Sequence, residues 1–287
     1  MFDKVESFHR PRSVREAVRL LHGGNGRARV VAGGTDLVVE ADRSVRVLID
    51  ITHAGLSYIR RRGNACVIGA ATTMAELEAS PAIHSLADGI LAKAASTCGS
   101  LQIRNMATIG GNLAHGSPAA DTATPLLVLD AAVVVADERG RRKASLQAGY
   151  AEWHGALPGK ALIVEIDIPA PPHGSRWSFH KLGRTELDIA VVNVATGLLL
   201  DSKGHVKWAR IALGAVAATP IRAARAEALM AGRLFGHDLL AEVADEVERE
   251  VTPITDVRAS AEYRRLMSRV LVRRALEECA EEPGCPL

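Results

Sequence analysis

The first fifty residues combine one helical apolar pattern with two strand-like runs. Between residues 13 and 22, apolar side chains recur at helical spacing, and two glycines end the run. Ser13 and Glu16 have the spacing of a capping box, in which the two residues satisfy each other's backbone N–H groups. Two runs rich in β-branched residues follow at 28–32 and 45–51. The pattern predicts a small unit of β-α-β type.

The middle of the chain contains a hairpin pattern and several apolar runs. Residues 59–71 form two apolar stretches around a turn at 62–64. A second capping box starts at Thr73, and the alanine- and leucine-rich run at 82–98 predicts one buried helix. The other predicted elements are a short helix at 122–129 and strands at 131–136 and 161–168.

A proline cluster at 169–172 is the best candidate for a domain boundary. Beyond it, the apolar pattern predicts three strands, at 176–182, 189–200 and 205–214, and three helices, at 222–231, 238–251 and 260–279. On the last helix we expect the apolar stripe to consist of Tyr263, Leu266, Met267, Val270 and Leu271. The second half is therefore predicted to be an α+β module in which helices pack on one sheet.

Composition and charge limit the kinds of protein and of partner that this sequence suggests. The 287 residues are 48% apolar and 24% charged, which is ordinary for a globular chain long enough for two domains. Lys and Arg exceed Asp and Glu by only two, which argues against nucleic acid or an anionic membrane as a partner. The amino terminus lacks the apolar core of a signal peptide, and no apolar run is long enough to span a bilayer, so we expect a cytoplasmic protein.

The cysteines and histidines lack the spacing of a metal site. Cys66, Cys98, Cys279 and Cys285 do not form a zinc or iron–sulfur pattern, and Cys66 and Cys98 are expected to be reduced thiols in the core. The ten histidines are scattered, so no metal ligand is predicted. No Ser-His-Asp pattern is visible, and no catalytic acid or base is predicted.

Two glycine pairs carry the most specific chemistry. Residues 32–36 and 108–112 are alike in construction: apolar residues lead into two glycines, and short polar side chains follow. The second stretch continues to a carboxylate, Asp121. Because glycine lacks a Cβ atom, two such loops facing each other can bring backbone N–H groups close to a pyrophosphate. Taken singly, each pair is more often only a turn. Neither Gly-x-Gly-x-x-Gly nor a Walker-type Gly-Lys-Ser/Thr is present, so a dinucleotide would need a fold other than the Rossmann or P-loop folds.

Together, residues 32–37, 102–112 and 117–121 resemble the FAD-binding medium subunit of the molybdenum hydroxylases, the family of carbon monoxide dehydrogenase and xanthine dehydrogenase. Further segments resemble the family in order over nearly the whole chain. The resemblance implies an α+β fold with a vanillyl-alcohol-oxidase-like (PCMH-type) FAD-binding domain and a smaller carboxy-terminal domain of a three-stranded sheet with helices. The implied domains are 1–172, with subdomains at about 1–55 and 56–172, and 173–287.

The resemblance also implies which residues bind FAD. Asp121 matches a carboxylate on the ribose or adenine side of the cofactor, and Lys181 matches a lysine near the flavin ring. Ile163 and Ile189 match positions beside the isoalloxazine, although core packing explains them equally well. The residues expected to embrace the pyrophosphate are Ala32, Gly33, Gly34, Thr35, Asp36, Leu37, Thr108, Ile109, Gly110, Gly111 and Asn112. His115 has no role in this scheme.

The implied function is that of an oxidoreductase subunit. A large subunit would oxidise the substrate, such as CO, a purine or another N-heterocycle, at a molybdopterin centre. A small subunit with two 2Fe-2S clusters would pass the electrons to FAD in this chain, and an external acceptor, NAD, a quinone, a cytochrome or oxygen, would take them. The complex is expected to be a dimer of heterotrimers. Two alternatives stay open at this point: a stand-alone flavin-dependent oxidase or dehydrogenase, and a non-catalytic nucleotide-binding protein.

Overall fold

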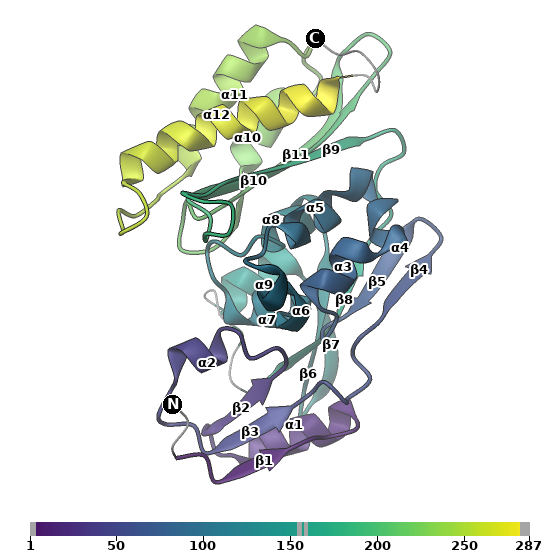
Figure 1. The fold of residues 1–287 in the computed structure, drawn as a ribbon. Coiled ribbons are helices and arrows are strands. Elements are labelled where there is room, and N and C mark those ends of the chain that lie inside the picture. Colours follow the sequence, from purple (N-terminus) through teal and green to yellow (C-terminus); the bar gives the residue numbers. More distant parts are fainter. Residues whose placement is uncertain (1–3, 154–156, 158–159, 282–287) are drawn as a thin grey trace.

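The computed structural model describes residues 4–153, 157 and 160–281, and it arranges three sheets along the long axis of the molecule (Figure 1). A small parallel sheet lies at the amino-terminal end, a five-stranded antiparallel sheet lies in the middle, and a four-stranded antiparallel sheet lies at the carboxy-terminal end. Helices cover the sheets, so the predicted α+β class is confirmed. Cys285 lies outside the described residues.

The small sheet has the strand order β1-β3-β2 with both pairings parallel. The expected β-α-β unit is confirmed, with an additional first strand that the sequence did not reveal. Only half of the first predicted capping box forms, because Glu16 accepts from the backbone N–H of Arg12 rather than from that of Ser13. The elements are β1 (Ser7–His9), α1 (Val14–Gly23), β2 (Ala28–Val31), α2 (Leu37–Glu40) and β3 (Val47–Asp50).

The middle sheet has the order β4-β5-β8-β6-β7. The predicted hairpin is confirmed as β4 and β5, and the strands predicted at 131–136 and 161–168 are β6 and β8. β7 was missed because its residues are mostly charged and exposed, as is usual for an edge strand. The bounds are β4 (Ile59–Arg62), β5 (Ala65–Gly69), β6 (Ala132–Asp137), β7 (Gly140–Ser145) and β8 (Leu162–Ile168).

Short helices cover one face of the middle sheet, and two predictions fail among them. The single helix expected at 82–98 is wrong: Asp88 and Gly89 adopt left-handed φ angles of 52° and 71°, which split it into α4, a 3-10 turn and α5. The stretch 108–112, expected as a loop, begins a helix instead. The helices are α3 (Met74–Ala79), α4 (Pro81–His84), α5 (Ile90–Ser96), α6 (Leu101–Met106), α7 (Ile109–His115), α8 (Ala123–Val128) and α9 (Leu146–Trp153).

The carboxy-terminal sheet contains the three predicted strands and a fourth, two-residue strand, in the order β12-β11-β10-β9. Three helices cover one face, and α5 and α8 reach the other (Figure 1). The predicted stripe on the last helix is wrong, because Tyr263 and Leu266 are exposed whereas Arg264 is buried. The elements are β9 (Arg176–Leu182), β10 (Val192–Leu200), β11 (Val206–Gly214), β12 (Ile221–Arg222), α10 (Ala224–Met230), α11 (His237–Glu250) and α12 (Ala261–Ala280).

Three apolar clusters form the core. The largest fills the middle of the molecule, contains Cys66 and Cys98 as buried free thiols, and includes Trp177 and Phe179 from β9. This cluster therefore crosses the position at which the sequence places the domain boundary, and the division at residue 172 stays a prediction. The second cluster lies under α10, α11 and α12, and the third joins α1 and the small sheet to β8.

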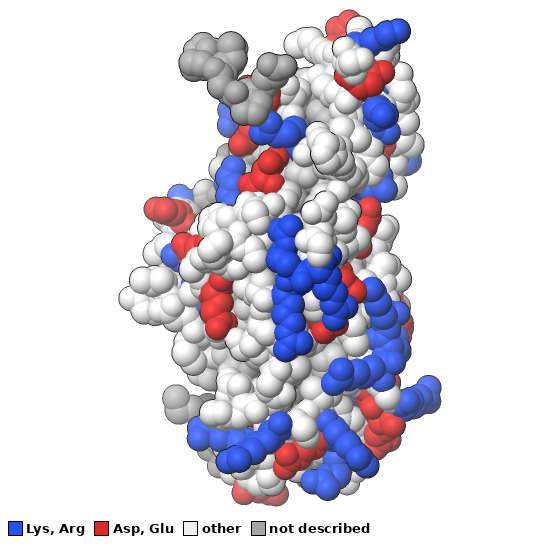
Figure 2. Space-filling view, turned by 90° about the vertical axis from the view of Figure 1, so that its right-hand side faces the viewer, with Lys and Arg blue, Asp and Glu red and all other residues white. Residues whose placement is uncertain are grey.

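Charged side chains lie on the surface in mixed arrangements. Figure 2 shows Lys and Arg across the middle and lower parts of one face, with Asp and Glu between them. Ion pairs join Lys143 to Asp167 and Arg142 to Glu152. Because both signs alternate there, this face differs from the uniformly basic stripe of a nucleic-acid-binding surface.

Candidate functional site

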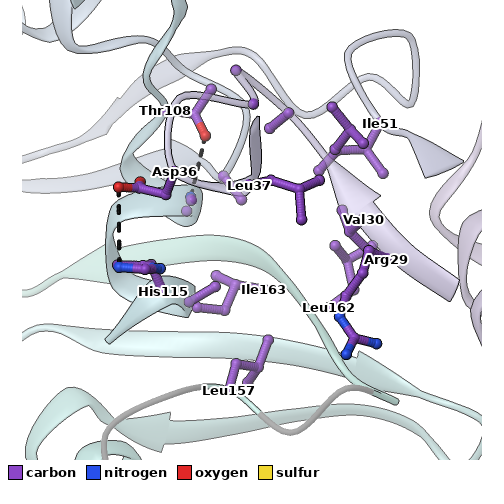
Figure 3. A pocket seen from close by; sticks show the side chains of 18 of the residues that line it. Arg29, Val30, Asp36, Leu37, Ile51, Thr108, His115, Leu157, Leu162 and Ile163 are labelled. Atoms are coloured by element: carbon purple, nitrogen blue, oxygen red, sulfur yellow. Dashed lines mark hydrogen bonds and ion pairs between the residues drawn. The ribbon is translucent and has the colours of Figure 1, made fainter. Parts of the chain in front are cut away.

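A cavity of about 340 Å³ lies where the small parallel sheet meets the five-stranded sheet (Figure 3). Its polar wall comes from the loop after β2 and from the start of α7. Its apolar wall includes Leu157, Leu162 and Ile163, which come from the connection to β8 and from that strand. Both glycine pairs therefore face the same cavity, as expected from the sequence.

In the first glycine loop, residues 32–36, the backbone passes very close to another segment of the chain. A Cβ atom on Gly33 would lie 1.8 Å from the carbonyl oxygen of Met106, and Gly34 has a left-handed φ of 71°. Only glycine fits both requirements. The N–H groups of Gly33, Gly34 and Thr35 have no hydrogen-bond acceptor among the described residues. This loop therefore offers backbone donors to the cavity.

The second glycine loop, residues 108–112, forms the N-cap and first turn of α7, and the N–H groups of residues 109–112 are already engaged. The N–H of Ile109 donates to the carbonyl of Thr72 at 3.0 Å, and the N–H of Gly110 donates to the carbonyl of Ala70 at 2.9 Å. Thr108 caps the helix by accepting from the N–H of Gly111 at 3.1 Å. The expectation that this loop presents bare N–H groups is therefore wrong.

Side chains supply the second loop's polar groups instead. The Thr108 hydroxyl accepts one hydrogen bond and still has its own proton to donate. The side-chain oxygen of Asn112 accepts from the hydroxyl of Thr122 at 2.6 Å, which directs the amide nitrogen of Asn112 to other partners. The two loops thus combine backbone donors on one side with hydroxyl and amide donors on the other.

His115, at the end of α7, approaches two carboxylates of α2 and its cap. Its Nε2 atom lies 4.0 Å from Asp36 (Figure 3). Its Nδ1 atom lies 3.4 Å from Glu40. All three side chains line the cavity and are partly exposed. A further lining residue, Arg29, pairs with Asp42 at 3.3 Å.

Asp121 and Lys181 lie outside the lining of this cavity and contact each other. The Nζ atom of Lys181 donates to Asp121 at 2.7 Å and to the carbonyl of Thr97 at 2.7 Å, and the amide of Asn193 donates to the other oxygen of Asp121. Both charged side chains are more than nine-tenths buried. Burial outweighs the attraction of Lys181 and raises the pKa of Asp121 above its usual range.

The structure therefore divides the predicted cofactor-binding residues. All of them line the cavity except Ile109, Asp121, Lys181 and Ile189. Ile109 is fully buried in the core, whereas Ile189 is half exposed before β10.

Several lining residues were not predicted from the sequence. Leu21 lies near the end of a predicted helix and Ile51 at the end of a predicted strand, and these positions were the only sequence signal for them. Leu157 and Glu40 had no such signal. Within the described ranges, no group of three His, Cys, Asp or Glu side chains is arranged to hold a metal ion. Among the same residues, no helix is long and apolar enough to cross a membrane.

Comparison with known proteins identifies the family. Residues 3–171 match the model of the FAD binding domain in molybdopterin dehydrogenase. The chain belongs to this family. Residues 177–279 match the model of the CO dehydrogenase flavoprotein C-terminal domain, and the resemblance inferred from the sequence is confirmed. The chain thus carries an FAD-binding domain and is of the type of the FAD subunits of molybdenum-containing oxidoreductases.

Named relatives cover almost the whole chain. The 6-hydroxypseudooxynicotine dehydrogenase complex subunit alpha of Paenarthrobacter nicotinovorans is 37% identical over 92% of this chain and 90% of its own length. The carbon monoxide dehydrogenase medium chain of Hydrogenophaga pseudoflava is 32% identical over 94% of this chain and 95% of its own length. A solved structure of carbon monoxide dehydrogenase from Hydrogenophaga pseudoflava matches with a TM-score of 0.91 at 34% identity, covering 97% of this chain and 98% of that chain. The fold class is therefore confirmed.

Proposed function

We propose that the protein is the electron-transfer subunit of a heterotrimeric molybdenum hydroxylase. A large subunit would oxidise the substrate at a molybdopterin centre, and a small subunit with two 2Fe-2S clusters would deliver the electrons. FAD supplies the redox chemistry that passes them to an external acceptor. The observation that carries the proposal is the cavity between the two glycine loops, in a chain whose relatives are medium chains and complex subunits along their full length.

The cavity fits the pyrophosphate and one end of FAD. Its volume of about 340 Å³ is at the lower end of the range for small-molecule sites, so it encloses part of a dinucleotide and the remainder extends beyond it. The free N–H groups of residues 33–35 would bind one phosphate face, and Thr108 and Asn112 would bind the other. Among the described residues that line the cavity there is no lysine, and Arg29 is paired with Asp42, so the phosphates would be held mainly by neutral donors.

Lys181 and Asp121 would act at the other end of the cofactor. The resemblance implies that Lys181 lies near the flavin ring, and a 2.7 Å contact joins Lys181 to Asp121. This contact favours the isoalloxazine end for both side chains, whereas the expected place of Asp121 on the ribose or adenine side stays a prediction. A buried cation here would stabilise negative charge on a reduced flavin. The chain's residues bind and tune the cofactor, and none needs to act as an acid or base.

Purification tests the proposal directly. The chain, expressed alone, should bind FAD in a one-to-one ratio and show the visible spectrum of a flavoprotein. Expressed with its neighbouring genes, it should co-purify with two further polypeptides, iron and molybdenum. A colourless protein that takes up no added FAD would refute the flavin assignment, and a flavoprotein that stays alone and oxidises a substrate by itself would instead establish a stand-alone enzyme.

Lys181→Met tests the second end of the site. The substitution leaves the Asp121 carboxylate buried without its cation, so we expect a loss of about 3 to 5 kcal/mol in the free energy of unfolding at neutral pH. We also expect any retained flavin to show a shifted redox potential. The double variant Lys181→Met/Asp121→Asn should recover most of the stability, because it removes the charge along with its partner. An unchanged potential in the double variant would remove the pair from the flavin environment.

The pH dependence of Lys181→Met follows from the raised pKa of Asp121. Removing Lys181 raises that pKa further, so the folded state binds the carboxyl proton more tightly than the unfolded state does. Such a group stabilises the folded state as the pH falls. The stability gap between Lys181→Met and the unchanged protein should therefore narrow when urea denaturation is repeated at about pH 5 instead of about pH 8.

A further inference from the structure

His115 joins the two walls of the cavity at a place where negative charge accumulates. It lies in the last turn of α7, while Asp36, the N-cap of α2, and Glu40, the last residue of α2, lie about one helical turn apart. Like charges at this spacing repel each other. Among the described residues, His115 is the only basic side chain within 4.0 Å of either carboxylate.

The surroundings of His115 contain few other charges. α2 and its N-cap contribute Glu40 and Asp36. The other charged lining residue, Arg29 of β2, is paired with Asp42. The connection before β8 contributes Leu157, whose N–H donates to the carbonyl of Ala114. The remaining partner is the carboxy-terminal end of α7 itself, whose carbonyl groups favour a positive charge. The imidazole thus faces the two carboxylates on one side and the carbonyl end of α7 on the other.

A bound pyrophosphate would increase the need for this positive charge. Asp36 ends the first glycine loop, and its carboxylate lines the same cavity as the N–H groups of residues 33–35. Two phosphate charges next to two carboxylates would repel one another and displace the loop. A cation between α7 and α2 offsets this repulsion and fixes the loop at the same time.

We propose that His115 is a positioning residue that, when protonated, offsets part of the negative charge of Asp36 and Glu40 and thereby holds the first glycine loop in the form that receives the pyrophosphate of FAD. FAD is therefore retained more tightly below the pH range in which the imidazole loses its proton than above it. The inference rests on the proposed flavin function and adds a charge-dependent control of cofactor binding to it.

The test compares the dissociation constant of FAD at two pH values in three proteins. The full chain, freed of flavin, is titrated with FAD at about pH 5.5 and about pH 8, on the two sides of the range in which histidines titrate. We expect the unchanged protein to bind FAD about two- to fivefold more tightly at the lower pH, the size of a partly exposed charge pair. His115→Gln should bind weakly at both values, and His115→Lys should bind tightly at both.

Two further measurements separate charge from structure. The triple variant His115→Gln/Asp36→Asn/Glu40→Gln removes the two carboxylates that His115 offsets, so it should regain the affinity that His115→Gln loses. The thermal unfolding midpoints show whether His115→Gln is folded. An unchanged pH dependence in His115→Gln, or no pH dependence in the unchanged protein, would overturn the inference while leaving the flavin function intact. Failure of the unchanged protein to bind FAD at both pH values would instead overturn the proposed function.

Discussion

The two glycine pairs of the cavity share a sequence pattern but differ in structure. In the first glycine loop, Gly33 permits a backbone contact with Met106, and Gly34 takes a left-handed φ. In the second, both glycines are helical and line the cavity, but Gly110 also packs closely against Ala70, whereas a Cβ atom on Gly111 would meet only Thr108. Among the described residues, the first loop has N–H groups without an acceptor, whereas the N–H groups of Ile109 and Gly110 in the second donate to Thr72 and Ala70.

This difference shows that a glycine pair can be required for a close backbone contact, for the packing of a helix or for access of a ligand. Gly33 allows its loop to pass close to the backbone of Met106, and Gly110 allows α7 to contact the end of β5. Of these three glycines, only Gly111 leaves space that a ligand can use. A single methyl group at each position therefore probes a different requirement. The expected losses of stability differ accordingly.

Gly33→Ala should have the largest effect. The added Cβ would lie 1.8 Å from the oxygen and 2.4 Å from the carbon of the Met106 carbonyl, and neither backbone atom can move without displacing α6. We expect a loss of about 3 kcal/mol or more in the free energy of unfolding, together with the loss of FAD. Urea denaturation and the flavin content of the purified protein measure the two effects.

A matched control for Gly33→Ala is Gly23→Ala at the end of α1. A Cβ there meets nothing within 4 Å, so the stability should change by no more than about 0.5 kcal/mol and the flavin content should stay the same. Equal stability of the two variants would mean that the close approach of the first glycine loop to Met106 is not a requirement of the fold.

Gly110→Ala should have an intermediate effect. Its Cβ would lie 2.6 Å from both the Cβ and the carbonyl oxygen of Ala70, so α7 must shift away from the end of β5. Overpacking of this kind costs about 1 to 3 kcal/mol, and the better helix propensity of alanine offsets up to about 1 kcal/mol. We expect a net loss of stability in thermal unfolding and a weaker, secondary loss of FAD. Unchanged stability with FAD lost would show that Gly110 is needed for ligand access rather than for packing against Ala70.

The comparison also shows which features of the fold could be predicted from the sequence. Strands with β-branched runs were predicted well, because their apolar pattern is local. The helical state of 108–112 was missed because two glycines are poor helix formers, and the contacts that favour the helix, the carbonyls of Ala70 and Thr72, come from a distant part of the chain. Tertiary contacts thus outweighed local propensity.

The errors in α5 and α12 have similar causes. The break lies at the Asp88-Gly89 dipeptide, a turn signal that the prediction overlooked because alanine, leucine and isoleucine dominate residues 82–98. On α12, Arg264 is buried because it donates to the carbonyls of Val191 and Ala215 and pairs with Asp256. A sequence pattern assigns such an arginine to the surface, and the predicted stripe shifts with it.

The candidate site was predictable in part for the same reason. The glycine loops were recognisable because their chemistry is local, but the apolar wall of Leu21, Ile51 and Leu162 forms only when the small sheet packs against β8. The pairing of Asp121 with Lys181 across 60 residues left no trace in either local pattern. Sequence reasoning thus identified the donors but not the shape of the site.

Gly111→Ala should have the smallest effect on stability and the clearest effect on the ligand. Its Cβ would meet only the hydroxyl of Thr108, at 2.9 Å, and a hydroxyl at the end of a side chain can rotate away. We expect the free energy of unfolding to stay within about 0.5 kcal/mol of that of the unchanged protein, because the better helix propensity of alanine offsets a weakened N-cap. The methyl group would occupy the cavity, so the dissociation constant of FAD should rise about tenfold, a change of about 1.4 kcal/mol. A stability loss as large as that of Gly110→Ala, with FAD affinity unchanged, would reverse the roles assigned to the two helical glycines.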